Sequence, residues 1–271
     1  MVLKLLVLCV DGLDPDLAKK YGFPSMPYER KLTIPENLCQ NGKPRTLKVW
    51  PAIFTEGYVP DDDVLDAFFR KPFPSNVLFQ LNRYVRKLFV TMGAKKIIGF
   101  FKKDYKRVSK KTFNWEARGS TWKIVPFNAR IRTIADDYDS VMWNVPTLCP
   151  EFVFQMPFED GANFRLREYV NWKILTEGMS LYPLDLGIAY CHIIDYFGHI
   201  RRPLKELYLD VHQHAQRLSK RCDIMIVSDH GILPETAEHT KHAYLGCTRE
   251  VKAESVVDVK KDIRRIMEEK K

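Results

Sequence analysis

Six acidic or imidazole side chains follow short apolar runs in this chain and could bind metal ions. Each run has the length and composition of a buried strand, and the polar residues stand at its C-terminal end. They are Asp11, Asp195, His199, Asp229 and His230, with His239 a little further along the chain. In open α/β sheets, sites are built at that edge, so we expect these side chains to converge.

Carboxylate oxygens and imidazole nitrogens are ligands for hard-to-borderline divalent cations. Asp195 and His199 are four residues apart, so both can reach one ion where a strand end turns into a helix. Asp229 and His230 are adjacent at a second strand end, and Asp11 ends the first strand. Any one of these is usually a turn or a solvated pair. Their conjunction predicts two divalent cations, with Zn²⁺ preferred and Mn²⁺ as an alternative.

The elements that position these residues predict an α/β fold. Strand-like runs alternate with helical segments, which is typical of a mostly parallel central sheet with helices on both faces. We expect strands at 3–10, 140–145, 186–194, 223–228 and 243–247. We expect helices at 14–21 (capped by Asp14), 49–55, 164–177 (ended by Gly178), 204–218 and 255–269. A further helix should begin at 61–63, and 130–136 should form a helical turn. Residues 23–45 are expected to be loop with short strand pieces. All of this fits one α/β domain over residues 1–271.

Residues 72–130 differ in composition and predict a helical or irregular cap inserted beside the site. From Arg83 to Arg132, fifteen Lys or Arg residues stand against Asp104 and Glu116, a net charge of +13, whereas the whole chain carries +9. Basic residues favour phosphate contacts and the interleaved aromatic residues favour base stacking, so we expect a nucleotide or a nucleic acid as substrate. The alternative is a solvated basic face whose lysine stems cover apolar surface.

Composition excludes several classes. The hydrophobic share of 45% and the charged share of 28% are those of an ordinary globular protein. Six cysteines without a C-x-x-C pair indicate buried apolar residues in a reducing compartment, so we predict a cytoplasmic protein. The apolar run in the first ten residues is too short for a signal peptide. The sequence contains no run of about 18 apolar residues, so we expect neither a membrane span nor a membrane partner. The oligomeric state stays open.

Three of these motifs, in this order, resemble the alkaline phosphatase superfamily. They are Asp11-Gly12 after the first strand, Asp195-x-x-Gly198-His199, and Ser228-Asp229-His230-Gly231. Within that superfamily they are most similar to the type I phosphodiesterase and nucleotide pyrophosphatase branch. The resemblance covers roughly residues 1–60 and 139–247 and leaves out the basic middle. It implies that Asp195, His199 and a later histidine bind one cation, and that Asp11, Asp229 and His230 bind the other. His239 matches the later histidine best, with His242 as the alternative.

The resemblance also implies a nucleophile, which in this family is a Thr or Ser at a helix N-terminus, bound to the second cation. The segment from Thr46 to Thr55 keeps the family's spacing, so Thr46 is the expected nucleophile and a further ligand. Cation binding would activate its hydroxyl, and amides at the helix start would hold a phosphate oxygen. Thr55 is the competing hydroxyl, and Thr46 as a mere helix cap is the other alternative.

The chain departs from the family pattern beyond this threonine. Glu56 separates Thr55 from Gly57, and the His-Gly that commonly follows the helix is absent, so the substrate-binding residues stay unknown. No C-x-P-x-R signature follows any cysteine, which argues against a formylglycine sulfatase.

These features predict a metal-dependent hydrolase of phosphodiester or pyrophosphate bonds in nucleotides or nucleic acid. Thr46 would attack phosphorus in line to form a phospho-enzyme, and water activated at the cation of Asp195 and His199 would then hydrolyse it. A phosphomonoesterase on the same site is one alternative. A nucleic-acid-binding protein that kept the fold and lost turnover is the other.

Overall fold

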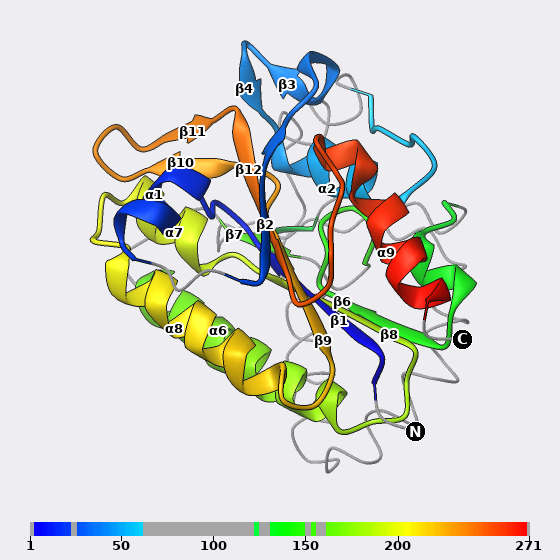
Figure 1. Cartoon of the computed structure of the whole chain (residues 1–271). Coiled ribbons are helices and arrows are strands. Elements are labelled where there is room, and N and C mark those ends of the chain that lie inside the picture. The colour runs from blue at the N-terminus through cyan, green and yellow to red at the C-terminus, as the bar shows by residue number, and fades with distance from the viewer. Residues whose placement is uncertain are drawn as a thin grey trace, which may run out of the picture.

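The structure, a computed structural model, describes residues 3–22, 26–61, 122–124, 131–149, 153–155 and 161–269 (Figure 1). Its strands are β1 Leu5–Val10, β2 Tyr28–Thr33, β3 Cys39–Gln40, β4 Lys43–Pro44, β5 Trp122–Ile124, β6 Ser140–Trp143, β7 Val153–Gln155, β8 Leu186–Cys191, β9 Asp223–Val227, β10 Gly231–Leu233, β11 Glu238–Thr240 and β12 His242–Cys247. Its α-helices are α1 Pro15–Lys20, α2 Thr46–Phe54, α6 Gly161–Ser180, α7 Ile193–His199, α8 Lys205–Leu218 and α9 Val259–Glu268, with 3-10 turns η1 Glu36–Leu38, η2 Ile134–Asp137 and η3 Val256–Asp258.

The central sheet has the strand order β2-β12-β9-β1-β8-β6. Strand β1 lies in the middle and pairs in parallel with β8 on one side and β9 on the other. Strand β6 extends the parallel part beyond β8, whereas β12 runs antiparallel to both β9 and β2. The expected α/β fold with a mostly parallel sheet is therefore confirmed, and the carboxyl ends of β8, β1 and β9 lie next to one another at one edge.

Helices cover both faces of this sheet (Figure 1). Helices α2 and α9 pack on one face, with Leu5 and Val7 of β1 in that core. Helices α6 and α8 pack on the other face, with Leu6 and Leu8 of β1 in the second core. Alternate residues of a strand point to opposite faces, so a continuous apolar run is what a strand covered on both sides requires. No described helix combines the length and the apolar character needed to cross a membrane.

Most of the expected elements are present with small shifts at their ends. The first helix begins at Pro15, and the Asp14 carboxylate accepts hydrogen bonds from the Asp16 and Leu17 amides at 2.9 and 3.0 Å, so the predicted cap is confirmed. The strand expected at 186–194 ends at Cys191, because α7 begins at Ile193. The ligand Asp195 therefore stands in the first turn of a helix.

The structure differs from the expectations in three further places. Gly178 does not end its helix, because α6 continues to Ser180 and the buried Met179 packs on β8 beside Gly187. The region 23–45 contains a full strand, β2, which the pattern missed because this edge strand buries only Leu32. The hairpin of β10 and β11, which carries His239, was not expected at all.

The expected cap at 72–130 and the helix opening at 61–63 lie almost entirely outside the described residues. Of the cap, the structure describes the backbone of β5, which pairs antiparallel with β7. The placement of the basic segment beside the site therefore stays a prediction.

One glycine lets two ligand-bearing segments meet. Gly12 has φ +78°, and a Cβ added there would lie 2.7 Å from the Asp195 Cα, closer than real Cβ atoms come. The Asp195 amide donates to the Asp11 carbonyl at 3.1 Å, so this close approach joins the end of β1 to the start of α7. Only a residue without a side chain allows both the positive φ and the contact.

We predict that Gly12→Ala destabilises the fold far more than Gly57→Ala. Gly57 also has a positive φ, +82°, but a Cβ there meets nothing within 4 Å. The left-handed backbone should cost about 1–2 kcal/mol in both variants. The clash should add about 1–3 kcal/mol or more at Gly12 alone. Urea unfolding measures the difference, and equal losses of stability in the two variants would show that the close approach carries no cost.

Candidate active site and metal centre

Three neighbouring strands deliver the predicted ligands to one edge of the sheet. Asp11 follows β1, Asp195 follows β8 at the start of α7, and Asp229 with His230 follows β9. The Ser228 hydroxyl fixes the last of these turns, because it donates to the Leu13 carbonyl at 2.8 Å and accepts from the Tyr244 amide at 2.7 Å. The ends of β1, β9 and β12 are thereby tied together beneath the ligands.

Three side chains surround the His230 Nε2 atom, and together with His230 they form what we call the Thr46 group: Thr46, Asp11, Asp229 and His230. This nitrogen lies 3.3 Å from Asp11 Oδ1, 3.3 Å from Asp229 Oδ2 and 2.9 Å from Thr46 Oγ1. The Asp11, Asp229 and His230 side chains are buried. Thr46 reaches them from the first residue of α2, which packs on the opposite face of the sheet from α7. The predicted ligands of the second cation therefore lie together.

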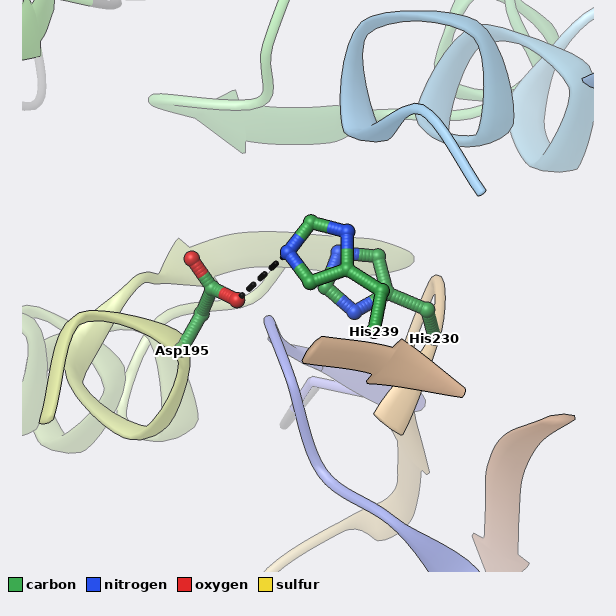
Figure 2. Close-up of side chains that lie close together, drawn as sticks. All are labelled: Asp195, His230 and His239. Atoms are coloured by element: carbon green, nitrogen blue, oxygen red, sulfur yellow. Dashed lines mark ion pairs between the residues drawn. The ribbon is translucent and has the colours of Figure 1, made fainter. Parts of the chain in front are cut away.

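The remaining predicted ligands form a second cluster, the His239 group. Asp195 Oδ1 lies 3.4 Å from His199 Nε2 and 3.3 Å from His239 Nε2, and the two imidazole nitrogens are 2.9 Å apart. Figure 2 shows His239 directed at Asp195. The His199 side chain is 43% exposed, whereas that of His230 is fully buried. The His239 group is thus the side of the centre that solvent and a substrate can reach.

The Thr46 group and the His239 group are in direct contact through two histidine rings. The rings of His230 and His239 stack with centroids 3.8 Å apart and an angle of 19° between their planes (Figure 2). Ligand atoms of Asp195, His230 and His239 all lie within 4.8 Å of one another, as do those of Asp11, Asp229 and His230. The centre is therefore one continuous cluster of potential metal ligands, with a group of them on each side of the stacked rings.

The unexpected hairpin explains how His239 reaches this centre. Ile232 of β10 stands opposite His239 of β11. Ile232 also packs so closely on Gly198 of α7 that a Cβ there would come within 2.5 Å of its side chain. His199 is the next residue of α7, so the same contact brings the two histidines together. Thr240 anchors the hairpin to α1 by donating to Asp14 Oδ2 at 2.7 Å.

The two alternative residues lie elsewhere. His242 is the first residue of β12, where its Cα stands opposite Thr33 of β2. The Thr55 hydroxyl is buried at the end of α2, where it donates to the Pro51 carbonyl at 2.8 Å and accepts from the Tyr58 amide at 3.0 Å. Thr46 makes no side-chain cap at the start of α2, whose N-cap residue is Arg45. The geometry therefore favours Thr46 and His239 over their alternatives.

Two side chains that the sequence analysis missed also touch the centre. The Tyr190 hydroxyl donates to Asp11 Oδ2, and His192 Nε2 lies 2.8 Å from Asp195 Oδ2. His192 also belongs to a potential ligand group with Asp11 and Asp195. Their spacing of two residues at the end of an apolar run is the only signal in the sequence, and it is too common to select them.

Burial and charge set the protonation of the carboxylates. Burial, with the charge of Asp229 next, raises the pKa of Asp11 well above its usual range. Burial also raises the pKa of Asp229, to about 7. Burial opposes ionisation of Asp195 as well, but the hydrogen bond from His192 and the charge of His239 outweigh it and hold that pKa well below its usual range. Three carboxylates thus crowd into one desolvated cluster.

The imidazoles respond in opposite directions. Burial and the charge of His239 lower the pKa of His230 to about 4, so His230 is a neutral donor at pH 7. Burial also works against a charge on His239, but its ion pair with Asp195 raises the pKa to about 9. The Nδ1 atoms of His230 and His239 face the Gly231 and Pro44 carbonyls, each at 3.2 Å. Because a carbonyl oxygen can only accept a hydrogen bond, Nδ1 of each ring carries the hydrogen, and Nε2 of each ring faces the centre.

The donor set fits divalent cations. Asp11 Oδ1, Asp195 Oδ1 and both Asp229 oxygens are buried and accept no hydrogen bond. Buried carboxylate oxygens of this kind are costly unless a positive charge meets them. Carboxylate and imidazole donors together are the ligands of Zn²⁺ and similar ions. The cluster is therefore a candidate divalent metal site.

Comparisons with known proteins give distant similarities. The sequence matches no protein-family profile and no curated protein. Similar solved structures include the PH0037 protein from Pyrococcus horikoshii (13% identity, TM-score 0.47, covering 99% of this chain and 98% of that one). They also include alkaline phosphatase from the Antarctic bacterium TAB5 (11%, 0.45, 99% of each chain) and murine ectonucleotide pyrophosphatase/phosphodiesterase 5 (16%, 0.37, 84% of this chain and 57% of that one). Because every TM-score is below 0.5, the function has to be inferred from the site itself.

We predict that divalent cations bind more tightly as the pH rises from 6 to 9. A cation competes with the protons on Asp229, whose pKa is about 7, and on His239, whose pKa is about 9. Both groups lose their protons over this range, so binding at pH 7 should release protons and the release should shrink toward pH 9. Calorimetric titration with Zn²⁺ in buffers of different ionisation enthalpy counts these protons. An affinity that is flat or falls with pH would contradict the prediction.

Proposed function

We propose that this protein is a metal-dependent hydrolase that cleaves phosphodiester or pyrophosphate bonds of nucleotides or nucleic acid, with Thr46 as the nucleophile. The observation that carries the proposal is the position of Thr46 Oγ1, 2.9 Å from His230 Nε2 inside a cluster with the buried Asp11 and Asp229. A hydroxyl at the start of a helix, aimed into a cluster of metal-type donors, is an arrangement that suits covalent catalysis at phosphorus.

The proposed cofactors are two divalent cations, Zn²⁺ or Mn²⁺. The Thr46 group would hold one of them and the His239 group the other. When bound, they would lower the pKa of the Thr46 hydroxyl and of a water molecule and stabilise the attacking and leaving oxygens.

The side chains of the Thr46 group would prepare the nucleophile. His230 Nδ1 faces the Gly231 carbonyl, so its Nε2 carries the lone pair and is free to bind a cation. Thr46 Oγ1 lies 2.9 Å from this nitrogen, so the same cation would hold both atoms and fix the direction of the hydroxyl oxygen. Thr46 and Leu47 are the first residues of α2, and the amides of a first helical turn have no partner within their helix, so they are available to a phosphate oxygen.

The reaction would proceed in two displacements. In the first, the Thr46 hydroxyl gives up its proton to solvent and Oγ1 forms a bond to phosphorus, while the bond to the leaving oxygen breaks and that oxygen keeps the electron pair. In the second, water attacks the phosphothreonine from the solvent-accessible side, where His199 lies; the bond from phosphorus to Oγ1 breaks, and Oγ1 recovers a proton as Thr46 is released. The buried walls around Asp11 and Asp229 would keep other water molecules away from the nucleophile.

The substrate is proposed to be a nucleotide or a nucleic acid because of the basic segment from Arg83 to Arg132, with its net charge of +13. A charge of this size attracts polyanions in a salt-dependent way. The structural arrangement of that segment lies outside the described residues, except for β5 and the residues from Ile131 onward.

The class of reaction can be tested with nitrophenyl esters. We expect hydrolysis of bis-(4-nitrophenyl) phosphate that EDTA abolishes and that Zn²⁺ or Mn²⁺ restores, at a kcat/KM at least tenfold above that for 4-nitrophenyl phosphate. A preference for the monoester would instead make the protein a phosphomonoesterase. Nucleic-acid binding without bound cations and without turnover would favour the degenerate binding protein.

The nucleophile can be tested by comparing Thr46, the first residue of α2, with Thr55, the C-cap residue of the same helix. We expect Thr46→Ala to lower kcat/KM by about 1,000-fold or more, with both cations retained, because the attacking oxygen is lost. Thr46→Ser should keep measurable turnover. Thr55→Val is the control: its hydroxyl serves the end of α2, so stability should fall by about 1 kcal/mol with little change in turnover. Full activity in Thr46→Ala would exclude Thr46.

A further inference from the structure

Tyr190 and His192 hold the two carboxylates that stand on either side of the centre. The Tyr190 hydroxyl donates to Asp11 Oδ2. His192 Nε2 lies 2.8 Å from Asp195 Oδ2 and 3.6 Å from Asp11 Oδ2. Tyr190 belongs to the carboxyl end of β8, next to the strand that precedes Asp11, and His192 directly follows β8 as the N-cap of α7. They therefore approach the carboxylates from the β8 side of the cluster.

The opposite oxygens of the same carboxylates face the imidazoles. Asp11 Oδ1 lies 3.3 Å from His230 Nε2, and Asp195 Oδ1 lies 3.3 Å from His239 Nε2. Both Oδ1 atoms are buried and accept no hydrogen bond. The two oxygens of each carboxylate therefore face different partners. Oδ2 contacts Tyr190 or His192, at or just after the end of β8, whereas Oδ1 faces an imidazole ring.

Tyr190 is itself held in place by the helix that carries Thr46. Its side chain is buried, and its ring meets the edge of Trp50 with centroids 5.5 Å apart and an angle of 88°. Trp50 stands one turn after Thr46 in α2 and stacks on Phe54. The position of the Tyr190 hydroxyl is therefore coupled to the position of the proposed nucleophile.

We propose that Tyr190 and His192 are positioning residues that orient Asp11 and Asp195 for cation binding. Donors that engage one oxygen of a carboxylate fix the direction of the other, and such outer partners commonly change metal affinity by 10–100-fold when removed. The inference rests on the proposed function, because it assumes that Asp11 and Asp195 are cation ligands. It adds two residues that the ligand motifs do not include.

The test compares cation binding in variants that remove or keep each donor. Tyr190→Phe deletes the hydroxyl and keeps the ring against Trp50. His192→Leu deletes the Nε2 donor, whereas His192→Gln places an amide nitrogen near the same position. Tyr244→Phe is the matched control, since the buried Tyr244 donates to Glu29 at 2.6 Å on another strand. Co²⁺ titrations followed by calorimetry and by visible absorption give affinity, stoichiometry and ligand geometry, and circular dichroism checks folding.

We expect Tyr190→Phe and His192→Leu to bind Co²⁺ about 10–100-fold more weakly than the wild type, with altered absorption bands and an unchanged number of ions. His192→Gln should recover most of the affinity, and Tyr244→Phe should match the wild type. Should His192→Leu not fold, the comparison of His192→Gln and Tyr190→Phe with the control still decides.

The outcomes separate this inference from the proposed function. Wild-type affinity and spectra in both Tyr190→Phe and His192→Leu would overturn the positioning roles and leave the hydrolase intact. A wild-type protein that binds no divalent ion would overturn both. Loss of one whole ion in His192→Leu, with the affinity for the other ions unchanged, would make His192 a ligand and overturn its positioning role.

Discussion

The structure depends on the burial of three carboxylates at one edge of a parallel sheet. Asp11, Asp195 and Asp229 are buried within hydrogen-bonding range of imidazole rings, and several of their oxygens accept no hydrogen bond. Removing ionised carboxylates from water costs several kcal/mol each unless positive charge compensates. Adjacent parallel strands leave these side chains no other place, because their carboxyl ends coincide. The sheet therefore imposes an electrostatic cost on these carboxylates. The imidazoles offset part of this cost, and divalent cations are suited to offset the rest.

The two faces of the sheet contribute different parts of the centre. Helix α2, packed on one face, presents Thr46 to the buried side of the cluster. On the other face, α7 and the hairpin of β10 and β11 bring His199 and His239 to the more exposed side. In the proposed reaction, a protein oxygen attacks phosphorus first and water attacks it second, so the centre would need one buried and one accessible side. The fold has two such sides because different helices cover the two faces of the sheet.

Close backbone contacts make the arrangement possible. Gly12 allows the start of α7 to approach the end of β1, and Gly198 allows β10 to pack on α7. Tyr190 of β8 and His192, which follows that strand, then contact the Oδ2 atoms of Asp11 and Asp195. The candidate ligands, these outer contacts and the helix of Thr46 thus belong to one packed unit. Outer contacts of this kind orient the ligands of a metal site.

The sequence alone indicated which strands the candidate ligands follow, because buried parallel strands are continuous apolar runs and Asp11, Asp195 and Asp229 come shortly after them. It also determined the α/β class, since the alternation of elements is local information. Only the tertiary structure decided that His239 and not His242 meets Asp195, because the hairpin that places it buries few residues and has no strong pattern. It alone placed Thr46, and not Thr55, beside His230 and brought Tyr190 and His192 to the carboxylates, because contacts between distant segments leave no periodic pattern in the sequence.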